Sequence, residues 1–294
     1  ARFDNNNSAV LSSLYLTIPS PNDVVPFAYR GLLFSLEHAK VASQLLAREV
    51  GYAQSAGVPV AILKGLRMGL FTGKTVIVTG GGKATLKDGS AGSIGIDIAF
   101  AKEGANLVIT GRNVAKLEAA KESLEAEYGV KVLPVQADVS AGQDNEAVVQ
   151  NVIDKAIEEF GRIDAVVNNA QASASGVTIA DHTMDQFNLA IYSGLYATYL
   201  YMQKAYPHLK ETKGSVVNFA SGAGLFGNYG QCSYAAAKEG IRGLTRVAAN
   251  EWGKDGINVN IVCPLAWTAA LENFQDAYPE AFKANVHMPP AGHY

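Results

Sequence analysis

The stretch TVIVTGGG, residues 75–82, decides the fold class of this chain. Its first five residues are typical of a buried strand, and three glycines follow them. Further on, Ser93-Ile94-Gly95 precedes an apolar stretch with helical spacing. Glycines between a strand and a helix let backbone N–H groups approach a phosphate, and the helix N-terminus adds its dipole. The stretch therefore predicts a strand–helix unit with a phosphate-binding turn.

The same alternation continues toward the C-terminus. Short apolar runs typical of strands recur at 106–110, 131–136, 165–168, 215–219 and 258–262. Helical patterns separate them, at 94–103, 114–128, 146–160, 184–209 and 233–252. Apolar strands alternating with helices predict a parallel sheet that is covered on both faces. We expect a doubly wound Rossmann fold, with three α/β/α layers, over residues 73–294.

Residues 1–72 stand outside this alternation. The first 26 residues are rich in Asn, Ser and Pro, and residues 27–53 carry an apolar stripe at helical spacing. We expect an N-terminal extension, an arm followed by a helix, that serves packing or oligomer contacts.

Composition narrows the classes of function. The chain has 294 residues, 48% hydrophobic and 17% charged, and its net charge of −3 argues against nucleic-acid binding. No apolar run reaches the length of about 18 residues that suggests a membrane span. Two cysteines and five scattered histidines form neither a disulfide framework nor a metal-ligand pattern. We expect a cytoplasmic protein with no metal, no membrane contact and no nucleic-acid partner.

The segment SGAGLFGNYGQCSYAAAK, residues 221–238, carries the candidate chemistry. Tyr234 and Lys238 lie one helical turn apart on one face. A lysine ammonium beside a phenol favours the phenolate, so we expect the pKa of Tyr234 to fall toward neutrality. Such a phenol can exchange a proton with an alcohol, and Ser221 can hold the same oxygen. A solvated Tyr–Lys pair is the alternative if the rest of the chain gives no support.

The end of the second predicted strand bears on the cofactor. Residues 110–113 read TGRN and contain Arg112 but no carboxylate. An acidic side chain there would bind a free ribose 2′-hydroxyl, whereas an arginine accommodates a 2′-phosphate. The pattern favours NADP(H) over NAD(H), with an ordinary surface arginine as the alternative. Lys83 and Lys87, in the loop between the glycines, could meet phosphate charge.

Residues 70–294 resemble the short-chain dehydrogenase/reductase family, in its carbonyl and hydroxysteroid-type reductase branch. The resemblance implies that Tyr234 is the acid/base, that Ser221 holds the substrate oxygen, and that Lys238 activates the tyrosine and binds the ribose. It also implies a cofactor site without a metal. The residues expected there are Gly80, Gly82, Ser93, Ile94 and Gly95 at the phosphate turn, Arg112 at the 2′-phosphate, Asp138 and Val139 beside the adenine, Asn168 and Ala170 along the channel, Tyr234, Lys238, Pro264 and Thr268.

The chain departs from the family pattern at several positions. Gln171 stands where the family has a glycine, and Ser93 replaces the middle glycine of the cofactor loop. Gly194 stands where the family often has a helix asparagine that supports a water chain to the lysine. Proton relay must therefore use another group or a water. The chain also stops at Tyr294, before the usual seventh strand, so we expect that strand to be lacking.

These features predict an NADP(H)-dependent oxidoreductase that interconverts a ketone and a secondary alcohol. The alternatives are a non-catalytic NADP(H)-binding sensor or scaffold, and an enoyl-type C=C reductase of the same superfamily. The resemblance further implies a homodimer or a homotetramer. Aromatic residues expected near the pocket favour an apolar or ring-bearing substrate; they are Tyr192, Tyr196, Tyr199, Phe226, Tyr229, Trp267, Phe274 and Tyr278.

Overall fold

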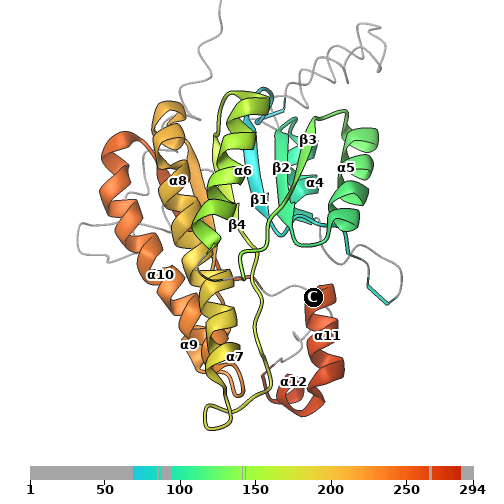
Figure 1. The fold of residues 1–294 in the computed structure, drawn as a ribbon, viewed down its shortest axis with the longest axis vertical. Helices are drawn as coiled ribbons and strands as arrows, with labels where there is room; N and C mark the ends of the chain where they lie inside the picture. Colours follow the sequence, from blue (N-terminus) through green and yellow to red (C-terminus); the bar gives the residue numbers. More distant parts are fainter. Residues whose placement is uncertain are drawn as a thin grey trace, which may run out of the picture. The chain divides into compact units, whose positions relative to one another are not determined.

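Six parallel strands form the centre of the structure, a computed structural model that describes residues 69–84, 86–87, 95–140, 142, 144–264 and 267–285 (Figure 1). The strands are β1 Thr75–Thr79, β2 Asn106–Gly111, β3 Val132–Gln136, β4 Ala165–Asn168, β5 Ser215–Phe219 and β6 Asn258–Val262. Their order in the described part of the sheet is β3-β2-β1-β4-β5-β6. This order confirms the predicted doubly wound Rossmann sheet. The expected arm and helix of residues 1–68 lie outside the described residues.

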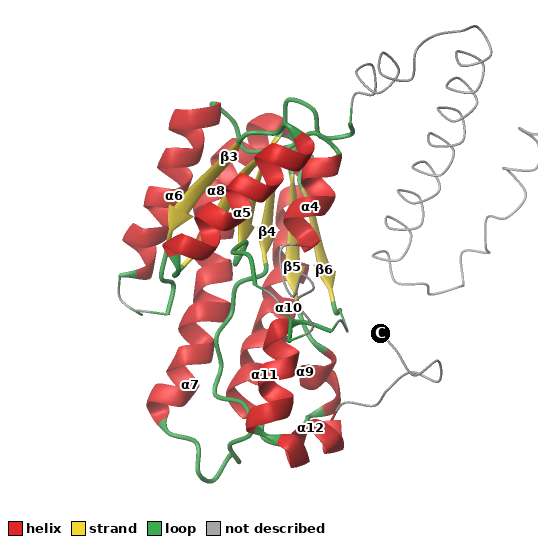
Figure 2. Ribbon diagram, turned by 90° about the vertical axis from the view of Figure 1, so that its right-hand side faces the viewer, coloured by secondary structure: helices red, strands yellow, loops and turns green. Residues whose placement is uncertain are grey.

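Helices cover both faces of the sheet (Figure 2). Those named here are α4 Gly95–Lys102, α5 Val114–Tyr128, α6 Asn145–Phe160, α7 Met184–Ala190, α8 Ala197–Thr212, α9 Gly222–Phe226, α10 Cys232–Trp252, α11 Ala269–Ala277 and α12 Pro279–Asn285. A π-helical turn, η1 Ile191–Tyr196, joins α7 to α8, and a 3₁₀ turn, η2 Gly253–Asp255, follows α10. None of the described helices is long and apolar enough to cross a membrane.

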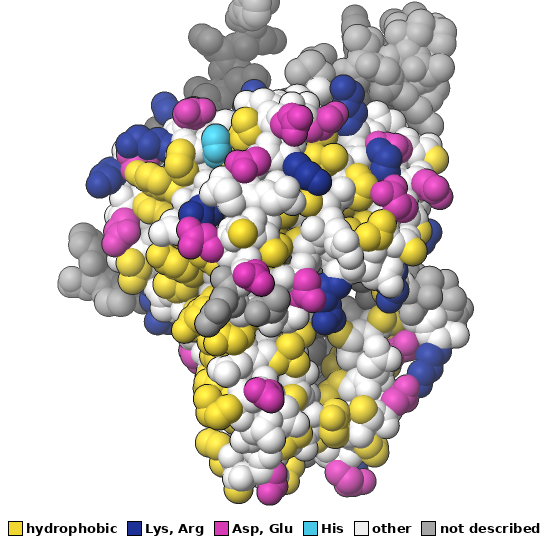
Figure 3. All heavy atoms as spheres, viewed as in Figure 1, with side chains coloured by type: hydrophobic (Ala, Val, Ile, Leu, Met, Phe, Trp, Pro, Cys, Tyr) yellow, Lys and Arg dark blue, Asp and Glu magenta, His cyan; other side chains and the backbone are white. Residues whose placement is uncertain are grey.

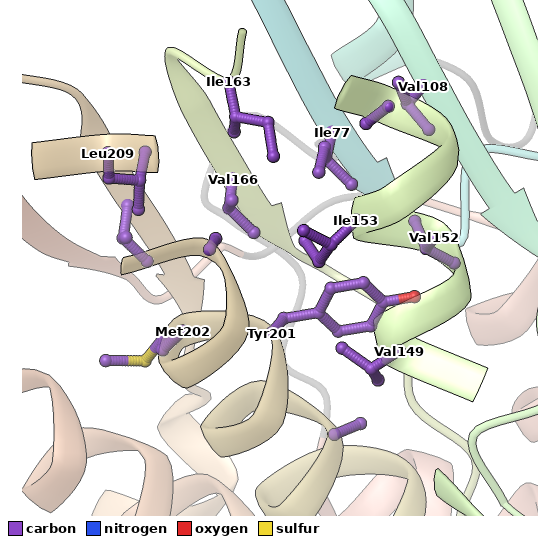
Figure 4. Close-up of a cluster of buried hydrophobic side chains, with 14 of the residues drawn as sticks. Ile77, Val108, Val149, Val152, Ile153, Ile163, Val166, Tyr201, Met202 and Leu209 are labelled. Atoms are coloured by element: carbon purple, nitrogen blue, oxygen red, sulfur yellow. The ribbon is translucent and has the colours of Figure 1, made fainter. Parts of the chain in front are cut away.

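The core consists of two layers, because successive side chains of a strand point to opposite faces. Ile77 of β1 packs with residues of α6 and α8, whereas Val76 and Val78 pack with residues of α4 and α5. Tyr201 of α8 is 1% exposed and lies among Val149, Val152 and Ile153 of α6 (Figure 4). All five residues of β1 are buried, which is why its sequence is apolar throughout instead of alternating.

The segment from 184 to 212 differs from the single helix that the sequence predicts over 184–209. Thr183 starts α7 with a capping box, and the helix then widens into the π-turn η1. Within that turn, the Ser193 hydroxyl donates to the Leu189 carbonyl at 2.6 Å and to the Ala172 carbonyl at 3.0 Å. A side chain that bonds to backbone carbonyls, followed by Gly194, accounts for the change of pitch, and π-turns often mark functional sites.

The strand β6 forms one edge of the sheet in the described part of the chain. It alternates exposed and buried residues, unlike the fully buried β1. The absence of a seventh strand stays a prediction, because residues 286–294 are outside the description.

Candidate active site

A cavity of about 840 Å³ opens at the carboxyl ends of the strands, where the strand order reverses between β1 and β4. This is the place where doubly wound sheets bind ligands. In the space-filling view, the surface is hollowed between the α7 side and the α11 side (Figure 3). Of the sequence-predicted cofactor residues, the cavity is lined by Gly80, Gly95, Arg112, Asp138, Val139, Asn168, Ala170, Pro264 and Thr268.

Some of the predicted residues lie elsewhere. Gly82 is not part of this wall, and a Cβ at its position would lie 3.3 Å from the Cβ of Lys116 on α5. Ser93 and Ile94 are outside the described residues. Ser221, Tyr234 and Lys238 do not line the cavity either, but they adjoin it through Phe219, which does. The Lys238 ammonium donates to the Phe219 carbonyl at 2.7 Å.

Tyr234 and Lys238 are close to each other on α10. The Lys238 Nζ lies 5.5 Å from the centre of the Tyr234 ring, as one helical turn of separation requires. Ser221 comes from the end of β5 and is the N-cap of α9, where its hydroxyl accepts from the Ala223 N–H at 3.1 Å. The same hydroxyl lies close enough to the Tyr234 phenol to favour a lower pKa of that phenol. The structure therefore brings together the three side chains that the sequence singles out.

The electrostatics of this pair differ from the expectation. Burial raises the pKa of the Tyr234 phenol, and the nearby Ser221 hydroxyl only opposes that rise. Burial also lowers the pKa of Lys238 to about 8. The expectation that the pKa of Tyr234 falls toward neutrality is therefore wrong. The reason is that both groups are removed from water, which favours their neutral forms. At neutral pH the phenol keeps its proton, and this is the form that can give a proton away.

The Thr79 hydroxyl holds the end of β1 against the turn after β4. It accepts from the backbone N–H groups of Asn169 and Ala170, both at 2.9 Å. The Asn169 amide in turn donates to the Thr79 carbonyl at 3.0 Å. Gly80 follows with φ +76°, and a Cβ there would lie 3.0 Å from Asn169 Nδ2, so glycine is required. Sequence reasoning did not assign a role to Thr79 or Asn169.

Asn168 is buried and connects the site to the core. Its amide donates to Asn218 Oδ1 at 2.8 Å, and Asn218 donates to Thr245 Oγ1 at 3.0 Å. Asn168 Oδ1 has no hydrogen-bond partner among the described residues. This chain of amides and a hydroxyl ties β4 and β5 to α10, the helix that carries Tyr234 and Lys238.

Arg112 and Asp138 line the cavity and follow the ends of β2 and β3. Arg112 is exposed, directly after β2, and its charge contributes to lowering the pKa of Asp138. The larger cause is the Ser140 hydroxyl, which donates to Asp138 Oδ1 at 2.5 Å. Asp138 is therefore ionised and fixed in orientation. The exposed guanidinium of Arg112 lines the cavity, where it can meet an anionic group.

The loop after the glycines contacts α11. Lys87 Nζ pairs with Asp276 at 2.6 Å, and the Lys87 backbone N–H donates to Glu272 Oε2 at 3.0 Å. Acidic groups of α11 therefore hold Lys87 in this structure, and its phosphate contact stays a prediction. Thr268, the N-cap of α11, accepts from the Leu271 N–H at 3.2 Å while it lines the cavity.

Loops and aromatic rings pack together at Gly176, a residue that does not line the cavity. The Tyr278 ring covers Gly176, where φ is +88° and a Cβ would lie 2.1 Å from the ring. The Gly176 N–H donates to the Gly230 carbonyl at 2.7 Å and so joins two loops. Among the expected aromatic residues, Trp267 lines the cavity, whereas Phe226 and Tyr229 are 82% and 61% exposed beside Ser221.

Asp97 of α4 is a site residue that sequence reasoning missed. It is 1% exposed, and neither carboxyl oxygen has a hydrogen-bond partner among the described residues. A Cβ at Gly81 would lie 3.0 Å from Asp97 Oδ1, so this carboxyl lies against the glycine turn. Burial raises the pKa of Asp97 to about 8, and the group is mostly neutral at pH 7.

We expect Asp97→Asn to stabilise the protein at pH 8. The unfolded carboxyl ionises near pH 3.8 and the folded one near 8, so the native state holds the extra proton between these values. Stability of the wild type therefore falls as the pH rises through this window and levels off above it. A gain of about 1 kcal/mol would raise Tm by about 2–4 °C.

Thermal melts from pH 5 to pH 9 measure this effect. The gain should be smallest at pH 5, grow as the pH rises and level off above about pH 8, and the exposed Asp154→Asn serves as the matched control. A gain that does not grow with pH would show that Asp97 is ionised in the folded protein.

Comparison with known proteins identifies the family to which the chain belongs. A profile of the short chain dehydrogenase family matches residues 74–277, and the chain belongs to this family. It is an oxidoreductase of a family that binds a nicotinamide cofactor and acts on CH–OH groups of small molecules. The predicted family and its hydroxysteroid-type branch are confirmed.

Individual relatives narrow the comparison. The chain is 63% identical over 227 residues to a 12α-hydroxysteroid dehydrogenase of Clostridium sp., covering 77% of this chain and 86% of the relative. It is 36% identical to levodione reductase of Leifsonia aquatica, over 69% of this chain and 73% of the relative. The crystal structure of a levodione reductase matches with TM-score 0.63 and 33% identity, over 73% and 81% of the two chains. An NAD⁺-bound xylitol dehydrogenase matches with TM-score 0.56 and 27% identity, over 66% and 71%.

Proposed function

We propose that this protein is an NADP(H)-dependent dehydrogenase that interconverts a secondary alcohol and a ketone on a ring-bearing, steroid-like substrate. The observation that carries the proposal is the arrangement of Tyr234, Ser221 and Lys238 beside the cavity at the strand-order reversal. The 63% identity to a 12α-hydroxysteroid dehydrogenase supports the substrate class.

The residues of the cavity fit a dinucleotide. Gly80 has a left-handed backbone conformation, which favours glycine. A Cβ at Gly81 would lie 3.0 Å from Ile109, so this position also favours glycine. Without side chains at these two positions, the backbone of the turn can lie close to a pyrophosphate. The wall also includes Arg112, Asp138 and Phe219. When it is bound, the nicotinamide supplies or accepts the hydride.

The side chains of the chain itself supply the proton chemistry. In ketone reduction, the neutral Tyr234 phenol donates its proton to the substrate oxygen and becomes a phenolate. The Ser221 hydroxyl donates its single proton to a hydrogen bond with the same substrate oxygen, and the Lys238 ammonium stabilises the negative charge of the phenolate electrostatically. Alcohol oxidation reverses these steps, with the phenolate as the base.

Apolar side chains near Ser221 support a bulky apolar substrate. Leu225, Phe226 and Tyr229 follow Ser221 on α9 and its loop and are 55%, 82% and 61% exposed. Exposed aromatic rings next to a reaction centre suit the flat faces of a ring system. Trp267 in the cavity wall adds a further ring.

Exposed apolar residues on η1, α8 and α10 support the homodimer or homotetramer implied by the family. Tyr196, Tyr199 and Val247 are 49%, 46% and 54% exposed. Burial of such residues against a second copy would remove them from water.

We expect Tyr234→Phe to lower kcat for ketone reduction by about 10²–10⁴-fold, the usual contribution of general acid catalysis. The dissociation constant of NADPH should change little, because the substitution removes only a hydroxyl. Steady-state kinetics and fluorescence titration of NADPH measure the two quantities.

The surface variant Tyr199→Phe is the matched control, since its hydroxyl only accepts from Gln203. A Tyr234→Phe enzyme with wild-type turnover on an accepted ketone would rule out the assignment. Binding of NADPH by the wild type without turnover on any ketone or alcohol would favour the sensor instead.

We expect Arg112→Ala to weaken NADPH binding by about 10- to 100-fold, as loss of a charge-assisted hydrogen bond to a phosphate does. NADH has no 2′-phosphate, and its affinity should stay nearly constant. Side-by-side titrations test this difference, with the exposed Arg246→Ala on α10 as the control. Tighter binding of NADH than of NADPH by the wild type would refute the interpretation of Arg112.

We expect kcat/KM for ketone reduction to fall as the pH rises through about 8. The pKa of Lys238 is about 8 in the folded protein, so its ammonium is present below this value and lost above it. Without the cation, the phenolate that Tyr234 leaves is less stable. A pH–rate profile checks the position of this limb.

Lys238→Arg gives the control for that profile, because a guanidinium stays charged at all accessible pH values. The variant should be slower, and its remaining activity should lose the limb near pH 8. A limb that persists unchanged in Lys238→Arg would assign the titration to another group.

A further inference from the structure

The Gln171 amide lies directly over the backbone of Gly194, in the π-turn η1. A Cβ at residue 194 would lie 2.7 Å from Cδ, 2.8 Å from Nε2 and 3.0 Å from Oε1 of Gln171. Real Cβ contacts are essentially never shorter than 3.0 Å. The two residues therefore share one space: the amide can stay where it is only while residue 194 has no side chain.

The backbone around Gln171 is fixed on both sides. The Ala170 N–H donates to Thr79 Oγ1 at 2.9 Å, and the Ala172 N–H donates to Ser193 Oγ at 2.9 Å. Ser193 returns a hydrogen bond to the Ala172 carbonyl at 3.0 Å. The loop 170–172 is thus tied to β1 at one end and to η1 at the other, and the direction of the Gln171 side chain follows from these contacts.

The polar atoms of this amide are shielded but unpaired. Both Nε2 and Oε1 of Gln171 are buried and have no hydrogen-bond partner among the described residues. A buried primary amide without partners is costly, so native structures satisfy it with protein, water or ligand. Because Gln171 lines the cavity, water in the cavity can supply the missing partners.

The same cavity wall includes Phe219, a residue in contact with Lys238. Phe219 lines the cavity with Gln171, and its carbonyl accepts from the Lys238 ammonium at 2.7 Å. An ammonium has three donors, so two remain for water or ligand. Lys238 is 4% exposed, and a proton that returns to Tyr234 from bulk solvent needs intermediate carriers. The cavity between Gln171 and Phe219 is a place for them.

We propose that Gln171 is a positioning residue whose amide orders water next to Lys238, and that this water returns one proton from solvent to the Tyr234 phenolate in each reduction. In oxidation the same proton travels outward. The proposal rests on the proposed function for its kinetic consequence. In this proposal Gln171 acts through the water and not through contact with the reacting atoms, and its contribution is the fixed location of the carrier.

Moving the amide from residue 171 to residue 194 tests whether the two side chains occupy the same space. Gly194→Asn alone should lower both Tm and kcat, because its side chain collides with Gln171. Gln171→Gly alone should lower kcat by about 10- to 100-fold, less than the full 10²–10⁴-fold contribution of general acid catalysis. The double variant Q171G/G194N places an amide on η1 instead and should recover kcat to within about 5-fold of the wild type.

An isosteric variant separates position from packing. Gln171→Met keeps the volume and removes every hydrogen bond of the amide. We expect Tm and the NADPH dissociation constant to stay close to wild type, kcat to fall by about 10-fold or more, and the solvent deuterium isotope effect on kcat to rise. Gln203→Ala, an exposed glutamine on α8, is the control. Wild-type kcat and pH profile in Gln171→Met, or a double variant no better than the product of the singles, would overturn the proposal.

A high-resolution crystal structure tests the proposal without turnover. We expect water hydrogen-bonded to the Gln171 amide and continuing to Lys238 Nζ. A dry amide, or one paired with protein groups only, would overturn the proposal while leaving the proposed function intact. The proposed function fails separately, if Tyr234→Phe is fully active.

Discussion

The hydroxyl of Thr79 is the contact on which the site depends. A parallel sheet brings the ends of β1 and β4 to one edge, but it does not fix the turns that leave them. By accepting from two successive N–H groups, Thr79 sets the path of residues 169–170 and places Asn169 against Gly80. The glycine turn of the cofactor cavity and the loop that carries Gln171 then share one anchor. A shift of either would move both, which would couple cofactor binding to the geometry of the proposed proton path.

Burial decides the electrostatics more than proximity does. The Tyr234 phenol and the Lys238 ammonium are one turn apart, yet burial raises the pKa of the first and lowers that of the second to about 8. Each neutral form is favoured because water is scarce around both. This state suits a proton donor, because the phenol is protonated before the reaction. The ammonium would stabilise a phenolate that forms beside it. In the proposed reaction, the stabilisation is thus directed at the charge that develops on Tyr234, which is where electrostatic catalysis is effective.

Much of the fold follows from local patterns. The strands at 75–79, 165–168, 215–219 and 258–262 were predicted with the boundaries that the structure has, because short apolar runs bounded by glycine or polar residues leave few alternatives. The helix over 114–128 is likewise confirmed, from its Asn113 cap to the left-handed Gly129. The short helices α9, α11 and α12 were not predicted. Their positions depend on contacts such as Lys87 with Asp276 and Tyr278 on Gly176, which link residues far apart in the sequence.

The candidate site shows the same division. Residue types and spacing single out Ser221, Tyr234 and Lys238, because a phenol and an ammonium four residues apart on a helix indicate proton transfer. The carboxyl of Asp97 was missed because nothing in GIDIAF indicates which side of α4 is closed off from water. The direction of the Tyr234 pKa shift was wrong for the same reason: spacing along a helix reveals a neighbour but not the loss of solvent.

Gln171 and Gly194 show how two departures from a family pattern can be one physical change. Taken separately, a side chain in place of a glycine and a glycine in place of an amide each look like a loss. In the structure the first fills the space that the second leaves, with the Gln171 amide 2.7 Å from where a Cβ of residue 194 would lie. The amide reaches the cavity from the β4 loop instead of from η1, and the π-turn keeps Gly194 Cα beneath it. Residues 23 apart in the chain therefore constrain each other, because the space between them admits only one side chain.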